Sequence, residues 1–285
     1  MKRLLAHVEA VLGVRPVDAT PLHGGCIAEV WRVELADGGH IVAKRPRGGG
    51  DPVTEGWMLR ELRRRGGLPV PEVLHAAPDL LLLEWIPHDD GGLDGRGEAE
   101  AAELLAALHA VTAPRFGLDR TTPIGPLHQP NPWTERWVDF FREHRLLHAA
   151  RRAHAAGRLP ARVLGRIERL AARLERWLEE PAAPALLHGD VWTGNVLVRG
   201  GRVAAFVDPA IYFGHPEMEI AFTTLFGPFG RTFYDRYAAL RGLDEGFFAL
   251  RRDLYNLYPL LVHVELFGGG YLRPILRTLD RLGIP

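Results

Sequence analysis

The sequence predicts an α+β protein of two lobes, a small lobe built on an antiparallel sheet with one helix and a larger, mostly helical lobe. Before Pro87, hydrophobic and polar residues alternate over several short segments, which is typical of half-buried strands. After Pro87, hydrophobic residues recur at every third or fourth position, as along the buried face of a helix. We therefore expect a small lobe at residues 1–87 and a large lobe at residues 88–285.

Short segments of the first lobe have the composition of strands. The turn Asp37-Gly38-Gly39 separates two of them at hairpin spacing. A sheet of about five strands is within the usual size for one lobe. The strands that we expect are residues 18–22, 31–35, 40–44, 70–75 and 80–86.

The helix expected in the small lobe follows Asp51. Aspartate is a good N-cap, and Pro52 suits the first helical position because proline has no N–H to leave unbonded. Leu59 and Leu62 contribute to an apolar face, and Gly66-Gly67 closes the helix. This helix carries Glu55 in its first turns.

The large lobe is predicted to consist of helices around one strand-rich stretch. Three helices are predicted at residues 98–111, 132–155 and 160–180, and the prolines that follow end the last of them. The strand-rich stretch covers residues 185–208, and helices resume to the end.

Composition excludes several classes of protein. The chain has 285 residues, 35 Lys+Arg against 35 Asp+Glu and a single cysteine, Cys26, so it forms no internal disulfide and carries no net charge to attract a polyanion. The apolar run at residues 80–83 stops at Glu84, well short of the roughly 18 residues that span a bilayer. The N-terminal residues lack the apolar stretch of a signal peptide. We expect a cytoplasmic protein with neither a nucleic acid nor a membrane as partner.

Lys44 is a candidate for chemistry. Lys2 and Lys44 are the only lysines, and every other basic residue is arginine. A lysine kept at the end of a strand in such a chain indicates a role that a guanidinium does not fill. Glu55, on the next helix, is its expected partner, although an ordinary ion pair of little consequence is the alternative.

The strand-rich stretch brings oxygen ligands together. In a hairpin with its turn at Gly200-Gly201, we expect Asn195 and Asp208 opposite each other, at the same open end. An amide oxygen and a carboxylate suit Mg²⁺, which is normally held by one or two protein groups and substrate phosphates. Asp190 lies on the loop that leads into the hairpin. The alternative is that these side chains only cap loops and turns.

The same stretch has the spacing of the protein-kinase catalytic loop. In that loop a histidine precedes the catalytic Asp by two residues, and a metal-binding Asn follows the Asp by five. His188, Asp190 and Asn195 have this spacing, and Asp208 stands where the kinase metal-binding Asp would be. A glycine-containing loop, a strand Lys and a helix Glu precede them in the order found in kinases. The joint order predicts a protein-kinase-like fold.

Two stretches resemble the fructosamine kinase, or ketosamine 3-kinase, family. They are His188-Gly189-Asp190-Val191-Trp192-Thr193-Gly194-Asn195 and residues 208–217, which begin Asp208-Pro209-Ala210. The similarity extends to residues 24–29, 225–229 and 255–271, and so covers nearly the whole chain. Glu219 stands where the family usually has Asp, and Pro228 replaces a usual Gly. We expect neither change to abolish activity, with Glu219 affecting at most how the catalytic loop is braced.

The resemblance implies ATP-dependent phosphorylation of the 3-hydroxyl of a ketosamine, the product of a sugar and an amine. The phosphorylated product releases the amine, so this activity repairs glycation. It also implies roles for the residues. Gly24, Gly25 and Cys26 would form the phosphate loop. Lys44 would hold the α- and β-phosphates and be oriented by Glu55, and Asn195 and Asp208 would bind Mg²⁺. Asp190 would take the acceptor proton, and the backbone of Glu84-Trp85-Ile86 would contact adenine.

Further roles and alternatives stay open. The resemblance places Trp192 and His263 near the acceptor, with core packing as the alternative for each. Cys26 is either a small packing residue or a thiol whose oxidation blocks ATP binding. An aminoglycoside- or choline-type kinase and a non-catalytic nucleotide-binding scaffold are the competing functions. The sequence leaves open the sugar, the amine and whether the protein is a monomer or a homodimer.

Overall fold

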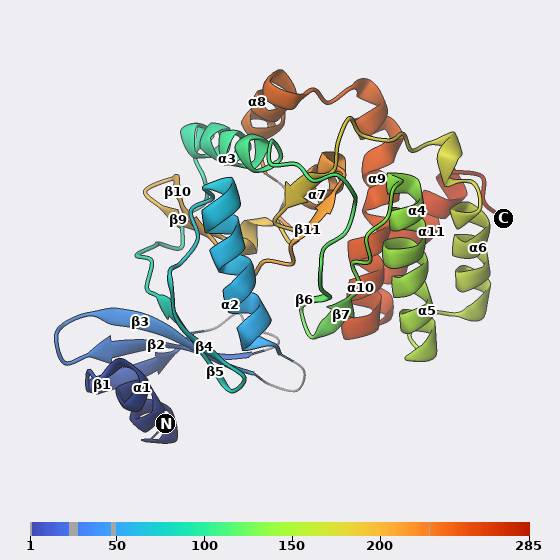
Figure 1. Ribbon diagram of the computed structural model, residues 1–285. Coiled ribbons are helices and arrows are strands. Elements are labelled where there is room, and N and C mark those ends of the chain that lie inside the picture. The colour runs from blue at the N-terminus through green and yellow to red at the C-terminus, as the bar shows by residue number, and fades with distance from the viewer. Residues whose placement is uncertain (1, 23–27, 47–49, 228) are drawn as a thin grey trace.

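The computed structural model describes residues 2–22, 28–46, 50–227 and 229–285. It has the two lobes expected from the sequence. The N-terminus and the large sheet lie at one end of the molecule, and the C-terminus lies among helices at the other (Figure 1).

The small lobe contains the expected five-stranded antiparallel sheet. Its strand order is β1-β2-β3-β5-β4, so the sheet is built from successive neighbours except where β5 lies between β3 and β4. The strands are β1 (Pro16–Pro21), β2 (Ala28–Leu35), β3 (His40–Pro46), β4 (Val73–Ala77) and β5 (Leu80–Glu84). The segment expected to begin at residue 70 becomes a strand only at Val73.

The predicted helix is α2 (Pro52–Glu61), which continues into a π-helical turn, Leu62–Gly66. The Asp51 carboxylate accepts a hydrogen bond from the Thr54 N–H at 3.0 Å, which confirms the predicted N-cap. At the other end, Gly67 takes a left-handed conformation with φ of 60°.

The small lobe has a second helix, α1 (Lys2–Leu12), so the expectation of one helix was wrong. Leu4 and Val8 are its buried residues, one turn apart. Leu5, Val11 and Leu12 are partly buried beside them, so apolar residues at helical spacing were present in the sequence and were missed. The helix forms because its apolar side packs on the outer face of the sheet.

The two faces of the sheet belong to different hydrophobic cores. The core on the outer face, which α1 covers, does not include α2. The outer core joins α1 to one face of the sheet and contains Leu4, Val8, Ala19, Val33, Leu35, Ile41, Ala43, Leu80 and Leu82. On the other face, Leu81 and Leu83 pack with Met58, Leu59 and Leu62 of α2 and its π-helical turn, in the same core as the helical lobe. The core of the large lobe therefore extends through α2 to the sheet.

The large lobe is mostly helical, as expected. Its helices are α3 (Gly95–Leu108), α4 (Trp137–Phe141), α5 (His148–Ala155), α6 (Ala161–Ala171), α7 (Pro216–Phe222), α8 (Arg231–Arg241), α9 (Arg252–Tyr255), α10 (Leu257–Phe267) and α11 (Leu272–Arg281). A π-helical turn, Arg142–Leu147, joins α4 to α5. The helix expected to run to residue 180 ends at Ala171, because Arg142 Nε donates to the Ala171 carbonyl at 2.8 Å and replaces the next helical hydrogen bond.

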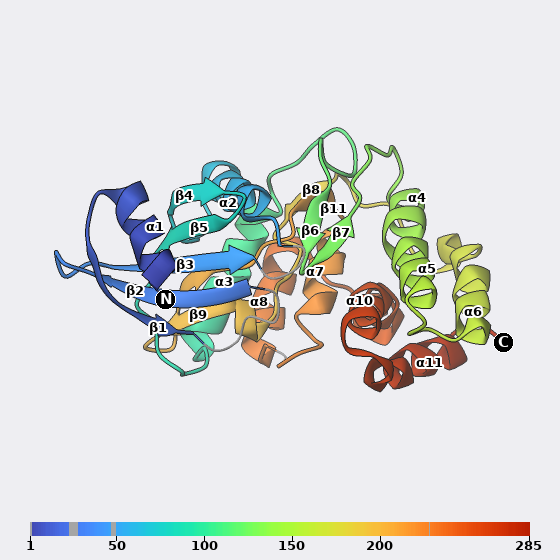
Figure 2. The ribbon, with the colours of Figure 1, turned by 90° about the horizontal axis from the view of Figure 1, so that it is seen from below.

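Three strand pairs lie inside the large lobe. They are β6 (Thr122–Ile124) with β7 (Leu127–Gln129), β8 (Ala185–Leu187) with β11 (Tyr212–Gly214), and β9 (Val196–Arg199) with β10 (Arg202–Phe206). Figure 2 shows the first two pairs between the large sheet and helices α4 and α5. These short strands carry the loops of the site.

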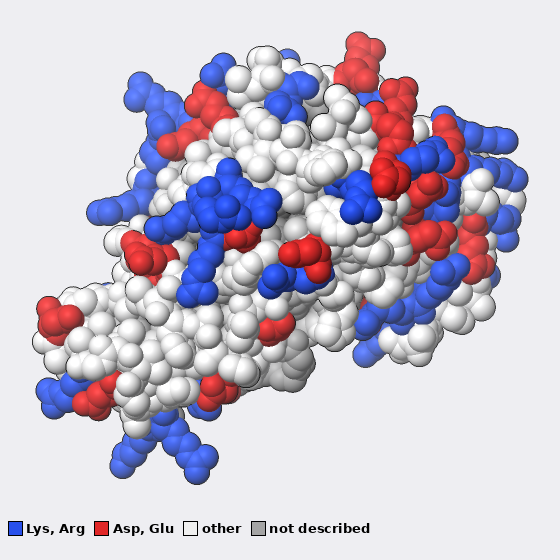
Figure 3. Space-filling view, in the orientation of Figure 1, with Lys and Arg blue, Asp and Glu red and all other residues white. Residues whose placement is uncertain are grey.

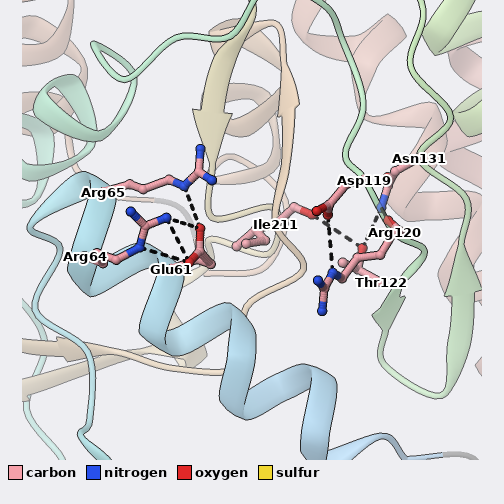
Figure 4. Close-up of polar contacts among 8 residues, drawn as sticks. All are labelled: Glu61, Arg64, Arg65, Asp119, Arg120, Thr122, Asn131 and Ile211. Carbon is pink, nitrogen blue, oxygen red and sulfur yellow. Dashed lines mark hydrogen bonds and ion pairs between the residues drawn. The ribbon is translucent and has the colours of Figure 1, made fainter.

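The surface mixes charges of both signs (Figure 3). One cluster of basic side chains lies at the end of α2, where Arg63, Arg64 and Arg65 follow one another. Glu61 bonds to two of them, Arg64 and Arg65, so part of this charge is paired (Figure 4). In the described parts of the chain, no helix is both long enough and apolar enough to cross a membrane.

Candidate active site

Lys44 pairs with one carboxylate from each lobe, Glu55 of the small lobe and Asp208 of the large lobe. It lies on β3, and its Nζ donates to Glu55 Oε1 at 2.7 Å and also to the Asp208 carboxylate. Burial by itself lowers the pKa of Lys44, but the charges of Asp208 and Glu55 outweigh burial and raise it. The pair predicted between Lys44 and Glu55 is present, and Asp208 is a second partner.

Asp190 follows β8 on the loop that resembles a kinase catalytic loop. Burial, together with the charge of Asp208, raises the pKa of Asp190 to about 8. Gly189 precedes it with φ of 87°, and a Cβ there would lie 2.0 Å from the Ala210 carbonyl oxygen. Glycine is thus required at the position where protein kinases have arginine, because the chain passes directly under residue 210.

A buried chain of hydrogen bonds holds this loop from below. Glu219 Oε1, on α7, accepts from the Gly189 N–H at 2.5 Å, and its Oε2 contacts His109 Nε2 at 2.8 Å. His109 Nδ1 in turn contacts the Tyr237 hydroxyl at 2.6 Å. The side chains of His109 and Glu219 are 0% exposed. Glu219 therefore braces the loop as expected, whereas the contributions of His109 and Tyr237 were not predicted.

Asn195 and Asp208 both reach the site, but the strands that lead to them are paired in a different register from the one expected. The two glycines of the β9–β10 turn, Gly200 and Gly201, both have positive φ, of 56° and 77°. The pairing shifts by one residue between Val203 and Ala205, a β-bulge, and the Val207 N–H donates to the Asn195 carbonyl. Asn195 thus lies opposite residue 207, and the expected symmetry with Asp208 was wrong by one residue.

The oxygen atoms of Asn195 and Asp208 fit a hard cation. Asn195 Nδ2 donates to both the backbone carbonyl and the carboxylate of Asp190, at 2.9 and 3.0 Å, which leaves the amide oxygen for a ligand. Among the described residues, no cluster of three or more His, Cys, Asp or Glu side chains could hold a metal. Two protein oxygens completed by phosphate oxygens and water are typical of Mg²⁺ sites.

The segment after Asp208 is fixed by the β6–β7 pair. Asp208 has φ of 55°, a left-handed conformation that few non-glycine residues adopt. Gln129 Nε2 donates to the Ala210 carbonyl at 3.0 Å and to Thr122 Oγ1 at the same distance. Thr122 is also bonded to Asn131, and Figure 4 shows both of them close to Ile211. Buried hydrogen bonds thus hold the backbone that positions Asp208.

One cleft of about 540 Å³ collects most of the predicted residues. Of the site residues predicted from the sequence, the walls of the cleft include Lys44, Glu55, Asp190, Trp192, Asn195, Asp208 and His263. Phe222, Phe226, Phe267 and Tyr271 line it as well and were not predicted as site residues, although two of the stretches matched in the sequence contain the last three.

Two predicted features are not placed in this cleft. Glu84, Trp85 and Ile86 connect the lobes as expected, but they are not among the lining residues. The Glu84 carboxylate accepts from the Glu72 N–H at 3.1 Å, and the Trp85 ring lies 4.8 Å from the Arg32 guanidinium. Their contact with adenine stays a prediction. Gly24, Gly25 and Cys26 lie outside the described residues.

Comparisons with known proteins agree with the arrangement of the site. The family model for fructosamine kinase matches residues 2–283. The chain belongs to the fructosamine kinase family. Its fold is accordingly that of the protein-kinase-like phosphotransferases, and a kinase uses ATP as the phosphate donor.

Relatives of this fructosamine kinase family member cover most of the chain. A Synechocystis protein named as a ketoamine kinase is 38% identical over 207 residues, 71% of this chain and 67% of its own length. The protein-ribulosamine 3-kinase of Arabidopsis thaliana chloroplasts is 32% identical over 270 residues, 90% of this chain and 80% of that protein.

Solved structures show the same fold. A fructosamine-3-kinase structure from Thermobifida fusca superposes with a TM-score of 0.88, at 31% identity and over 98% of both chains. An aminoglycoside phosphotransferase in complex with streptomycin and ATP shares the fold alone, with a TM-score of 0.65 at 15% identity, over 98% of this chain and 95% of that one.

Proposed function

We propose that the protein is an ATP-dependent kinase that phosphorylates the 3-hydroxyl of ketosamines. The observation that supports this most is that Lys44, Asp190, Asn195 and Asp208 line one cleft in a member of the fructosamine kinase family. Relatives named as ketoamine kinase and protein-ribulosamine 3-kinase support the acceptor class.

Lys44 and Glu55 form the phosphate-binding side of the proposed site. The ammonium of Lys44 contacts the α- and β-phosphates, and Glu55, at 2.7 Å, holds the lysine in position. Asn195 and Asp208 hold Mg²⁺, and when bound there it supplies positive charge that offsets the charge developing on the transferred phosphoryl group. Catalysis in this reaction class depends mainly on positioning and electrostatic stabilisation.

Asp190 acts on the acceptor. One of its oxygens is bonded to Asn195, and the other is left to accept the proton of the 3-hydroxyl. Burial and the charge of Asp208 raise the pKa of Asp190 to about 8, so its carboxylate form is a stronger base than that of an ordinary aspartate. The Trp192 ring lines the same cleft and offers a flat surface for the sugar and its nitrogen.

The test is ATP consumption with Mg²⁺ and a panel of acceptors. The panel contains ribulosyl-lysine, fructosyl-lysine, kanamycin, choline and a control without acceptor. We expect turnover with the two ketosamines alone. Turnover with kanamycin or choline and none with a ketosamine would contradict the proposed acceptor class while leaving the kinase site intact.

A further inference from the structure

Four aromatic rings in contact with one another line the cleft that Asp190 also lines. Phe226 follows α7, His263 and Phe267 lie on α10, and Tyr271 ends the short 3-10 turn Gly269–Tyr271 that follows α10. The His263 ring centroid is 4.3 Å from that of Phe226, 5.4 Å from that of Phe267 and 5.0 Å from that of Tyr271. We refer to these four residues as the aromatic wall.

His263 offers the wall a hydrogen-bond acceptor. Its Nδ1 donates to the Pro259 carbonyl at 2.8 Å. Burial lowers the pKa of His263, so the ring is neutral at physiological pH and Nε2 keeps its lone pair. The wall thus presents ring faces and one acceptor nitrogen, both of which favour a ligand that carries a positive N–H group.

The cationic side chains among the described lining residues of the cleft belong to the small lobe. They are Lys44 and Arg45, both on β3. On the side of the large lobe, the charged side chains among the described lining residues are Asp190 and Asp208, both carboxylates. A ligand lying between Asp190 and the aromatic wall therefore meets no cation on that side.

The outer end of the wall is open. The Phe267 side chain lies at the C-terminal end of α10, and the residue is 51% exposed although it lines the cleft. Exposed aromatic rings at the mouth of a site gain free energy when an apolar group of the ligand covers them.

We propose that the aromatic wall binds the protonated amine of the acceptor together with an apolar or aromatic substituent on that nitrogen. The inference rests on the proposed ketosamine kinase function. In a ketosamine the nitrogen is attached two carbons from the reacting C3, so a sugar that reaches Asp190 places its nitrogen nearby. The wall then selects among ketosamines by the group on the nitrogen, not by the sugar.

The experiment compares three acceptors that share the fructose unit: N-phenethyl-fructosamine, N-methyl-fructosamine and the neutral ether in which oxygen replaces the phenethyl-bearing nitrogen. We expect kcat/KM for the phenethyl amine to exceed that of the other two by about tenfold. Tyr271→Leu and Phe267→Ala should each raise KM for the phenethyl amine by roughly threefold to tenfold, with kcat unchanged. The KM for N-methyl-fructosamine should rise by less, because this acceptor offers the wall its protonated nitrogen but no large apolar group.

Phe248→Ala is the matched control, since Phe248 is an aromatic residue that is 39% exposed and lies outside the lining of the cleft. It should leave all three acceptors unaffected. Equal kcat/KM for the three acceptors, or unchanged KM in both wall variants, would overturn the role of the wall and leave the proposed function standing. Absence of turnover with any ketosamine, alongside turnover of kanamycin or choline, would overturn the proposed function and this inference together.

Discussion

The two sides of the cleft are held in place by different interactions. Under the catalytic loop, Gly189, Glu219 and His109 are linked by hydrogen bonds between groups that are largely shielded from water. On the opposite side, Lys44 is held by ion pairs, and the side chain of one partner, Asp208, is 51% exposed.

This difference indicates which side is preorganised. Buried, fully bonded polar groups fix one geometry, because breaking any of their bonds leaves a group without water or partner. Lys44 pairs with Glu55, which the proposed reaction keeps as its partner, and with Asp208, which the proposed reaction assigns to Mg²⁺. We therefore expect the catalytic loop to change little when ligands bind, whereas Lys44 would exchange Asp208 for phosphate oxygens in the proposed reaction.

The largest effect is expected from Asp190→Asn. The amide keeps the shape of the side chain but accepts no proton, so kcat should fall by about a thousandfold. The Kd for ATP, measured by calorimetry, should stay within about twofold, because Asp190 touches the acceptor and not the nucleotide. A variant that keeps wild-type kcat would exclude Asp190 as the base.

The second prediction compares the stability of two variants, each of which removes one carboxylate from one side of the cleft. Glu219→Ala leaves a buried Gly189 N–H and His109 without their partner, so the free energy of unfolding should fall by about 3–5 kcal/mol. Glu55→Ala should lower it by less than about 1 kcal/mol, since Lys44 keeps Asp208, and should instead raise the KM for ATP.

Urea unfolding of both variants measures this difference. Asp235→Asn is the control, because it removes only an exposed pair with Arg231 on α8 and should change stability by less than about 0.5 kcal/mol. Equal losses for Glu219→Ala and Glu55→Ala would show that the two sides do not differ in rigidity.

The smallest effect is a pH dependence at the start of α7, the helix that carries Glu219. His215 Nδ1 accepts a hydrogen bond from the Glu217 N–H at 3.0 Å, which requires an unprotonated nitrogen. Burial lowers the pKa of His215 from 6.5 to about 3. The unfolded chain therefore binds this proton first, and stability present above pH 6.5 is lost as the pH falls below it.

His215→Asn tests this pH dependence. Asparagine keeps an N-cap oxygen and does not titrate, so the fall in the free energy of unfolding between pH 6.5 and 5 should become less steep, by up to about 1.4 kcal/mol per pH unit. Unfolding curves at several pH values measure the slope. An identical slope in the variant would mean that other groups cause the acid sensitivity.

The parts of the site that the sequence predicts are those set by local spacing. Asp190 and Asn195 are five residues apart on one loop, and a strand and the next helix bring Lys44 to Glu55. Cap and turn residues such as Asp51 also act within a few positions of themselves. The order of such local motifs along the chain was enough to predict the fold.

The rest depends on distant packing. His109 is 110 residues from Glu219, and nothing in the composition around either residue indicates that they meet. The β-bulge at Ala204 changes no residue type, so the register of Asn195 is invisible until the strands are paired. The aromatic wall joins Phe226 to residues of α10, and any of these rings could equally have filled a core.

The position of α2 has a consequence for recombination between related kinases. Crossovers are tolerated where few contacts are cut, and the chain position at Pro87 looks suitable for exchanging the small lobe. Yet Met58, Leu59 and Leu62 are buried in the core of the large lobe. An exchange at Pro87 would give that core foreign side chains. An exchange that keeps this core intact has to leave α2 with the large lobe, and because α2 lies in the chain between β3 and β4, it needs a crossover on each side of the helix.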